Sequence, residues 1–280
     1  MFLLTDTGGT NTRIALGDES GVQRGTAQSF RNADFDSFDS VVSRYLSNQP
    51  HQSIRACAFA FAGPLSGRSP RLTNLDWAID ADKLQQKIGA PVRLLNDLEA
   101  MGRALPVLAA ADVLNLTTAT GTSNGQMLAV GVGTGMNACA VKAVEGSDVA
   151  VWSCEYGHSP LSASLMGALQ KQGLSPSNFT SVEHLFSGRG FAECRDQGVE
   201  EATFANWLGQ LCAALSMQFL PLGGLYLAGG VARAVLTMDS GAAFNDGLSQ
   251  ALPQSAVYPP VSLITADDAA LQGCLSVLTD

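Results

Sequence analysis

Two segments of the chain share one design, in which an apolar run enters a turn of glycine, threonine and asparagine and a second apolar run leaves it. The first is FLLTDTGGTNTRIAL at residues 2–16, and the second is QMLAVGVGTGMNACAV at residues 126–141. A turn this short between two strand-like runs predicts an antiparallel hairpin. The two copies lie far apart in the sequence, so they predict two similar domains that face each other.

Strand and helix signals alternate along the rest of the chain, which predicts an α/β fold. Further strands are expected at residues 22–30, 55–61, 92–96 and 225–228, and helices at residues 36–46, 82–88, 97–105, 163–171, 182–186, 204–219 and 267–278. The interruption near residues 99–112 predicts a small α/β domain over residues 1–105 and a large one over residues 106–266. We expect the C-terminal helix, within residues 267–280, to pack back on the small domain.

Composition excludes several classes of protein. The 280 residues are 46% hydrophobic and 15% charged, as in a compact soluble protein. No apolar run reaches the roughly 20 residues that a membrane span needs, and the N-terminus lacks the pattern of a signal peptide, so we expect no membrane partner and a cytoplasmic location. A formal net charge of −9 argues against nucleic acid as the main partner.

The six cysteines show no C-x-x-C pair and no zinc-type spacing with the three histidines. We therefore expect reduced thiols that lie mostly in the core. Cys154 stands apart, because it precedes the polar segment EYGH and is a candidate for an oxidation-sensitive thiol.

The first glycine turn suits a phosphate group. Adjacent glycines permit backbone angles that other residues avoid, so that successive N–H groups can point into one concavity, while Thr7, Thr10 and Thr12 add hydroxyls. The expected binding residues are Thr7, Gly8, Gly9, Thr10 and Asn11, and Asp6 at the end of the strand is a candidate ligand for Mg²⁺. The alternative is a tight hairpin in which glycine serves the turn alone.

The second glycine turn strengthens the phosphate interpretation. Gly133, Thr134 and Gly135 offer a second loop from the other domain, and two such loops would clamp one polyphosphate of a nucleotide. The diglycine Gly229-Gly230 would let a nucleoside approach the backbone closely, although a plain strand-to-helix turn is the alternative.

At this point a family resemblance becomes visible. The segments TDTGGTNTRIAL, FAGPLSGRSPRLTNLDWAI, LLNDLEAMGRAL, GVGTG, CEYGHSPL, VEHLFSGRG and LYLAGGVA resemble, in order and approximate spacing, the bacterial glucokinases of the hexokinase/actin-like ATPase superfamily. The resemblance runs from residue 2 to about residue 274. It implies two ribonuclease-H-like domains flanking a cleft, ATP and Mg²⁺ as cofactors, and transfer of the γ-phosphoryl group to the 6-hydroxyl of a hexose. It also suggests a homodimer.

The resemblance assigns roles to individual residues. Asp97 would be the general base that takes the proton from the attacking hydroxyl, and Asn96 beside it would bind the sugar. A carboxylate in a cleft suits that task, because a sugar hydroxyl is a poor nucleophile that must be oriented and deprotonated. Asp97 alone would also be interpreted as the cap of the following helix.

Three residues of the second domain complete the expected sugar site. Glu155 and His158 would hydrogen-bond sugar hydroxyls, and Glu183 would hold the anomeric end. Asn74 is a weaker candidate from a sugar-binding loop. Taken singly, His158 would be a structural histidine and Glu183 a residue favoured by the helix dipole.

The chain departs from the family at Tyr156, where a glycine is usual, and a bulky side chain there would reshape the floor of the sugar pocket. The expected function is an ATP-dependent glucokinase whose domains close to exclude water. The alternatives are a kinase for mannose, fructose or an N-acetylhexosamine, and a sugar-sensing protein without turnover.

Overall fold

The computed structural model describes residues 1–49, 53–63, 65, 67, 72, 75–118, 121–144, 149–236, 240–253 and 257–279. The chain divides into two compact units. Unit 1 comprises Met1–Leu108 and Asp267–Asp280, and unit 2 comprises Ala109–Ala266. Of the helices in the described ranges, none combines the length and apolarity needed to cross a membrane.

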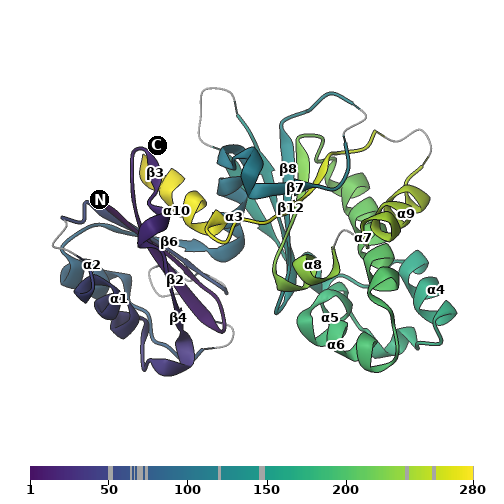
Figure 1. Ribbon diagram of the computed structural model, residues 1–280, viewed down its shortest axis with the longest axis horizontal. Coiled ribbons are helices and arrows are strands. Elements are labelled where there is room, and N and C mark those ends of the chain that lie inside the picture. The colour runs from purple at the N-terminus through teal and green to yellow at the C-terminus, as the bar shows by residue number, and fades with distance from the viewer. Residues whose placement is uncertain are drawn as a thin grey trace. The chain divides into compact units, whose positions relative to one another are not determined.

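A sheet of six strands forms the centre of unit 1 (Figure 1). Its strands are β1 (Phe2–Thr7), β2 (Asn11–Asp18), β3 (Gly21–Val22), β4 (Gln28–Arg31), β5 (Ala56–Phe61) and β6 (Val92–Asn96). The order is β3-β2-β1-β5-β6, with β4 also paired to β2. Since β1, β5 and β6 run parallel, their carboxyl ends lie at one edge of the sheet.

The single strand expected over residues 22–30 is wrong. The chain instead forms β3, a short 3₁₀ turn η1 (Arg24–Thr26) and then β4. The turn is stabilised by Thr26, whose hydroxyl donates to the Gln23 carbonyl oxygen at 2.7 Å and accepts from the Leu16 amide at 2.9 Å. These local side-chain bonds compete with the strand ladder at this point.

Helices cover both faces of the sheet of unit 1. Helices α1 (Phe38–Ser47) and α2 (Ala81–Ile88) bury apolar side chains against one face, together with Leu3 and Phe59. Helices α3 (Asp97–Ala104) and α10 (Ala269–Thr279) pack on the other face, with Leu4 and Ala58. Short 3₁₀ turns η2 (Asn32–Asp34) and η3 (Leu105–Val107) complete the unit. Successive residues of β1 and β5 thus serve opposite faces, as expected for a buried sheet.

Unit 2 also contains a six-stranded sheet, in the order β10-β9-β8-β11-β12-β7. The strands are β7 (Val113–Asn115), β8 (Gln126–Val132), β9 (Met136–Lys142), β10 (Ala150–Cys154), β11 (Gly224–Ala228) and β12 (Val261–Ile264). The hairpin of β8 and β9 repeats the design of β1 and β2, as the sequence predicted.

The helices of unit 2 build its large core. They are α4 (Ala163–Lys171), α5 (Val182–Phe186), α6 (Gly188–Asp196), α7 (Glu201–Phe219), α8 (Gly230–Val235) and α9 (Gly241–Ala251), with 3₁₀ turns η4 (Ala110–Asp112), η5 (Tyr156–His158) and η6 (Pro176–Asn178). Helices α7 and α9 lie side by side (Figure 1), and Phe204, Trp207 and Phe244 are buried in the core that these helices share with the sheet.

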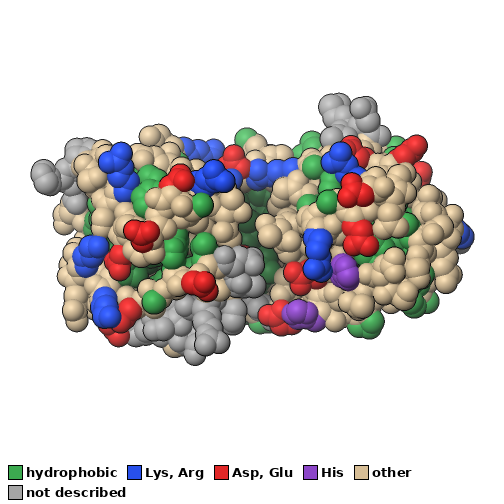
Figure 2. Space-filling model, turned by 90° about the horizontal axis from the view of Figure 1, so that it is seen from below, with side chains coloured by type: hydrophobic (Ala, Val, Ile, Leu, Met, Phe, Trp, Pro, Cys, Tyr) green, Lys and Arg blue, Asp and Glu red, His purple; other side chains and the backbone are tan. Residues whose placement is uncertain are grey.

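The cysteine prediction is confirmed, because all six cysteines are free and five of them are buried. Figure 2 shows acidic and basic side chains interspersed on one face of each unit.

Candidate functional site

Two carboxylates come together at the carboxyl edge of the sheet of unit 1. Asp6 is the penultimate residue of β1, and Asp97 follows β6 directly as the first residue of α3. Both are partly buried. Because β1 pairs in parallel with β5, and β5 with β6, both carboxylates lie at the same edge of the sheet.

The environment of Asp6 and Asp97 raises the pKa of both carboxylates. Burial, and secondly the charge of Asp6, raise the pKa of Asp97 from 3.8 to about 6, against hydrogen bonds that lower it. Burial likewise raises the pKa of Asp6, and the positive charge of Arg13 opposes that rise. A carboxylate with a pKa near 6 remains mostly ionised at pH 7 and is a stronger base than an exposed one.

Asn96, and not Asp97, caps helix α3. Its side-chain oxygen accepts from the amides of Leu98 at 3.0 Å and Glu99 at 3.3 Å, and its side-chain nitrogen donates to the Gly63 carbonyl oxygen at 3.0 Å. The interpretation of Asp97 as the cap is therefore wrong, and its carboxylate is left available for another role. Asn96 fixes the point at which β6 becomes α3.

Asn32 organises the first glycine turn, and the sequence analysis missed it. This buried residue accepts from the Thr12 hydroxyl at 2.8 Å, donates through its side chain to the Gly8 carbonyl oxygen at 2.9 Å, and donates through its amide to the Thr10 carbonyl oxygen at 2.9 Å. Thr12 is thus occupied by Asn32 and is not free to hold a phosphate. A polar residue at the start of a short 3₁₀ turn carries no signal that would have revealed this role.

The backbone of the first turn also corrects an expectation. Neither Gly8 nor Gly9 is among the described residues with a positive φ, so the turn does not use left-handed glycine angles. Around Gly8, an added Cβ would meet only the Asn11 carbonyl oxygen, at 3.8 Å. The turn therefore stays open over its backbone, and Thr10 and Asn11 are exposed there.

The residues around Asp6 fit a Mg²⁺ ion in their chemistry. The Asp6 carboxylate is a hard oxygen donor. The buried Thr5 and Thr7 hydroxyls, which have no hydrogen-bond partner, alternate with Asp6 along β1, so they lie on the other face of the sheet and do not belong to this site. No cluster of three potential metal ligands occurs within the described ranges. Mg²⁺ keeps several of its waters and requires only one or two carboxylates, so this donor set suits it better than a metal that needs a full protein cage.

In unit 2, the glycines expected to hold a nucleotide converge. The Gly188 amide, at the start of α6, donates to the Gly133 carbonyl oxygen at 2.7 Å. An added Cβ on Gly133 would meet the Gly230 nitrogen at 3.7 Å and the Gly229 Cα at 3.8 Å. The turn between β8 and β9, the start of α6 and the diglycine before α8 thus form one surface of bare backbone.

Gly229 is required by this close approach. It has a φ of +104°, and an added Cβ would collide with the Val132 carbonyl oxygen. Gly188 was missed by the sequence analysis, although it lies in the quoted segment VEHLFSGRG. Thr134 is exposed at the tip of the turn.

The three expected sugar ligands of unit 2 also gather. Glu155 accepts from the Asn137 side-chain amide at 2.9 Å, and its carboxylate lies 3.7 Å from the His158 Nε2. Glu183 is adjacent, because an added Cβ on Gly135 would lie 2.7 Å from its Oε1 and one on Gly157 would lie 3.2 Å from its Cβ. Sequence analysis missed Asn137, which follows the glycine turn.

These ligands are accessible. The side chains of Glu155 and His158 are 75% and 74% exposed. Glu183 lies between the glycine turn and the segment 155–158, so unit 2 places its candidate nucleotide and sugar residues next to each other. Asn74 lies outside the described residues.

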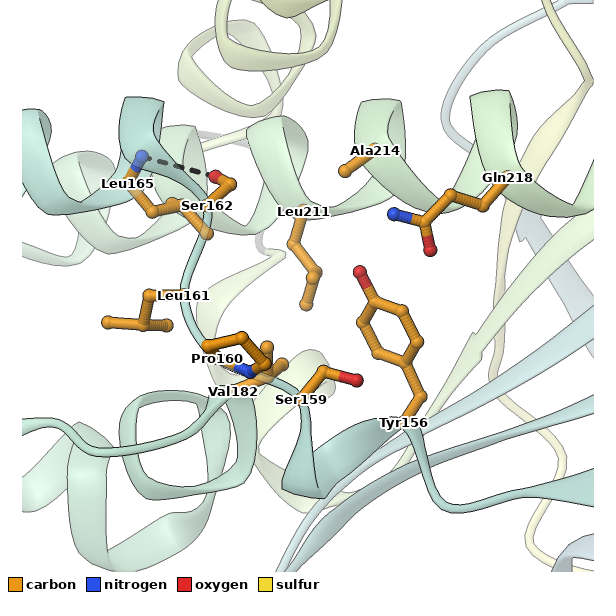
Figure 3. A pocket seen from close by; sticks show the side chains of 10 residues that line it. All are labelled: Tyr156, Ser159, Pro160, Leu161, Ser162, Leu165, Val182, Leu211, Ala214 and Gln218. Atoms are coloured by element: carbon orange, nitrogen blue, oxygen red, sulfur yellow. Dashed lines mark hydrogen bonds between the residues drawn. The ribbon is translucent and has the colours of Figure 1, made fainter.

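The structure bears on two expectations about the EYGH segment. The ring of Tyr156 is turned toward α7 (Figure 3), where it meets Phe219 edge to face with ring centroids 6.2 Å apart and packs against the core of unit 2. Burial, and secondly the nearby charge of Glu155, raise the pKa of the Cys154 thiol. A thiol with a raised pKa carries less of the reactive thiolate, so Cys154 is not activated for oxidation.

Comparison with known proteins gives a consistent result. The family model "Glucokinase" matches residues 3–202 and 196–280. The glucokinase of Cupriavidus pinatubonensis is 26% identical over 317 residues, covering 99% of this chain and 92% of the relative.

Solved structures agree with the family model. The crystal structure of a glucokinase from an Antarctic psychrotroph has a TM-score of 0.78 at 25% identity, covering 99% of this chain and 98% of the other. A ROK family glucokinase from Streptomyces griseus, solved in complex with glucose and AMPPNP, shares the fold with a TM-score of 0.61 at 18% identity, covering 99% and 98% of the two chains. Since the family model extends over nearly the whole sequence, the chain belongs to the glucokinase family.

Proposed function

We propose that this protein transfers the γ-phosphoryl group of ATP to the 6-hydroxyl of glucose. The observation that carries the proposal is the position of Asp97, a partly buried carboxylate with a pKa of about 6 that leaves the capping of its helix to Asn96. Family membership and the glucose and AMPPNP bound to the Streptomyces griseus glucokinase support this choice of substrates.

Asp97 acts as the general base in this proposal. Its carboxylate orients the 6-hydroxyl and accepts the proton as the oxygen attacks the γ-phosphorus. The bond from the γ-phosphorus to the bridging oxygen of ADP breaks as the new bond to the sugar oxygen forms. The raised pKa of Asp97 increases the basicity of the carboxylate while leaving it ionised at neutral pH.

Sugar recognition falls to polar residues of both units. Asn96 and Asn74 in unit 1, and Glu155, His158 and Glu183 in unit 2, would hydrogen-bond the hydroxyls of glucose. The exposure of Glu155 and His158 leaves their polar atoms free to reach a ligand. Discrimination among hexoses would come from these hydrogen bonds, since a site built to pair a hydroxyl rejects an analogue that leaves its polar groups unpaired.

The glycine turns hold the nucleotide. The backbone surface of Gly133, Thr134, Gly135, Gly229 and Gly230 allows close approach of the nucleotide, and the open turn of residues 7–11 would meet its phosphates. Asp6 would hold Mg²⁺, which supplies positive charge to the phosphate oxygens when it is bound.

A coupled assay of ADP formation over a panel of hexoses with Mg²⁺-ATP tests the proposal, with the product identified by ³¹P NMR. We expect glucose to give the highest kcat/KM and glucose 6-phosphate as product, and Asp97→Asn to lower kcat by roughly 10²–10⁴-fold. Rapid turnover of another hexose, with slow turnover of glucose, would show that this other hexose is the substrate. Binding of glucose without turnover of any sugar would instead indicate a sugar-sensing protein.

A further inference from the structure

Tyr156 occupies a central position in the candidate sugar segment. It is the first residue of the short 3₁₀ helix η5 and lies between Glu155 and Gly157 in the sequence. Its ring lies edge to face with that of Phe219, the last residue of α7, at an interplanar angle of 69°. Its hydroxyl points toward the side-chain amide of Gln218 in the same helix (Figure 3).

A cavity lies on one side of the Tyr156 ring. A cavity of about 300 Å³ separates the segment that follows η5 from α7, with Ser159 and Leu161 on one side and Leu211 and Ala214 on the other (Figure 3). Tyr156 reaches across one end of this cavity to the helix. Removal of the Tyr156 ring would enlarge this cavity, and the segment could then shift into it.

The other side of the segment is held by Gly157. An added Cβ there would collide with the Met136 carbonyl oxygen in β9 and would meet the Glu183 Cβ at 3.2 Å. The segment is thus fixed at two points, since Gly157 rests on β9 and α5 while Tyr156 rests on α7. Glu155 and His158 flank these two anchors.

We propose that Tyr156 is a positioning residue for sugar binding, whose ring anchors the Glu155–His158 segment to the end of α7 and so fixes the orientation of Glu155 and His158. The inference rests on the proposed function, in which those two residues bind glucose. It predicts that loss of the ring weakens glucose binding selectively, because the ring contact of Tyr156 and the cavity beside it lie toward α7, and the candidate nucleotide glycines are not among the described residues that line that cavity.

The test compares Tyr156→Ala, Tyr156→Phe and Phe219→Leu in the full chain, with KM for glucose and for ATP, kcat, and the glucose Kd from calorimetry. Aromatic edge pairs contribute enough to predict a roughly two- to tenfold rise in glucose KM and Kd for Tyr156→Ala, with ATP KM unchanged. Tyr156→Phe keeps the ring and should stay within about twofold of the wild type. The double variant Tyr156→Ala/Phe219→Leu should be no worse than Tyr156→Ala, since both changes remove one contact.

Met217→Ala is the matched control, because Met217 is an exposed residue of the same helix end. It should leave glucose KM unchanged. An unchanged glucose KM and Kd in Tyr156→Ala, or a parallel rise of glucose KM and ATP KM, would overturn the positioning role. Should the wild type neither bind nor phosphorylate any hexose, the proposed function itself fails, and the positioning role fails with it.

Discussion

Asp97→Asn is expected to make the protein more stable while it removes activity. The folded state disfavours the ionised form of Asp97 relative to the unfolded state, because burial and the charge of Asp6 raise its pKa from 3.8 to about 6. Each pKa unit corresponds to about 1.36 kcal/mol, so the ionised carboxylate destabilises the native state by roughly 3 kcal/mol at neutral pH. The pKa of about 6 already includes the favourable hydrogen bonds of the first turn of α3, so asparagine should give a net gain of about 2–3 kcal/mol.

The sign of this effect depends on pH. A group whose pKa is raised in the native state stabilises the fold below its unfolded pKa, and that contribution is lost as the pH rises through the folded pKa. The wild type should therefore lose stability relative to Asp97→Asn between about pH 4 and pH 6. Above pH 7 the difference should be constant.

Urea unfolding of both proteins at pH 8 and pH 5 measures this difference. We expect Asp97→Asn to have the higher midpoint at pH 8 and a smaller advantage at pH 5. Asp39→Asn is the matched control, because Asp39 also lies in the first turn of a helix, but its side chain is 44% exposed and pairs with Lys87 at 3.5 Å. It should change stability by less than about 1 kcal/mol, in the unfavourable direction. A less stable Asp97→Asn at pH 8, or an advantage of equal size at both pH values, would refute the reasoning.

Three further changes test the surrounding structure. Asn32→Ala should lower the free energy of unfolding by roughly 1–3 kcal/mol and raise ATP KM, because the buried bonds that hold the first glycine turn are lost; urea unfolding and steady-state kinetics measure this, and an unchanged stability would contradict it. Gly229→Ala should lower the free energy of unfolding and raise ATP KM severalfold, because the added Cβ collides with the Val132 carbonyl oxygen, whereas Gly230→Ala, which has open space around it, should leave the free energy of unfolding unchanged; an equal loss of stability in both variants would contradict the account. Asp6→Asn should lower the pKa of Asp97, which ¹³C NMR of the carboxyl group would detect as a midpoint below about 6.

The hairpins and most helices could be predicted from the sequence, because their signals are local. Helices 163–171 and 182–186 begin and end where expected, since Ser162 and Ser181 cap their first turns. Strands β7, β10 and β12 were missed. They are short, and pairing with neighbouring strands, more than their own composition, makes them strands.

The sequence could predict which residues belong to the candidate site, but not the hydrogen bonds that hold those residues in place. The family motifs identify Asp97, Glu155, His158 and Glu183, but they do not reveal that Asn96 is the cap or that Asn32 and Asn137 hold their neighbours in place. The bonds of Asn32 and Asn137 join residues 18 to 24 positions apart, and no spacing rule encodes them. The cap formed by Asn96 is local and follows the ordinary preference for asparagine at this position, but Asp97 competes for the same assignment in the sequence. The direction of the Tyr156 ring depends likewise on α7.

The pH dependence of kcat/KM for glucose, in the wild type and in Asp97→Asn, tests the role of Asp97 most directly. If Asp97 is the base, the wild-type rate should fall as the pH drops through about 6, reaching roughly one tenth of its plateau at pH 5. The residual rate of Asp97→Asn should lack this fall. A wild-type rate that is flat from pH 8 to pH 5, or a variant that keeps the same fall near pH 6, would contradict the assignment of Asp97 as the general base.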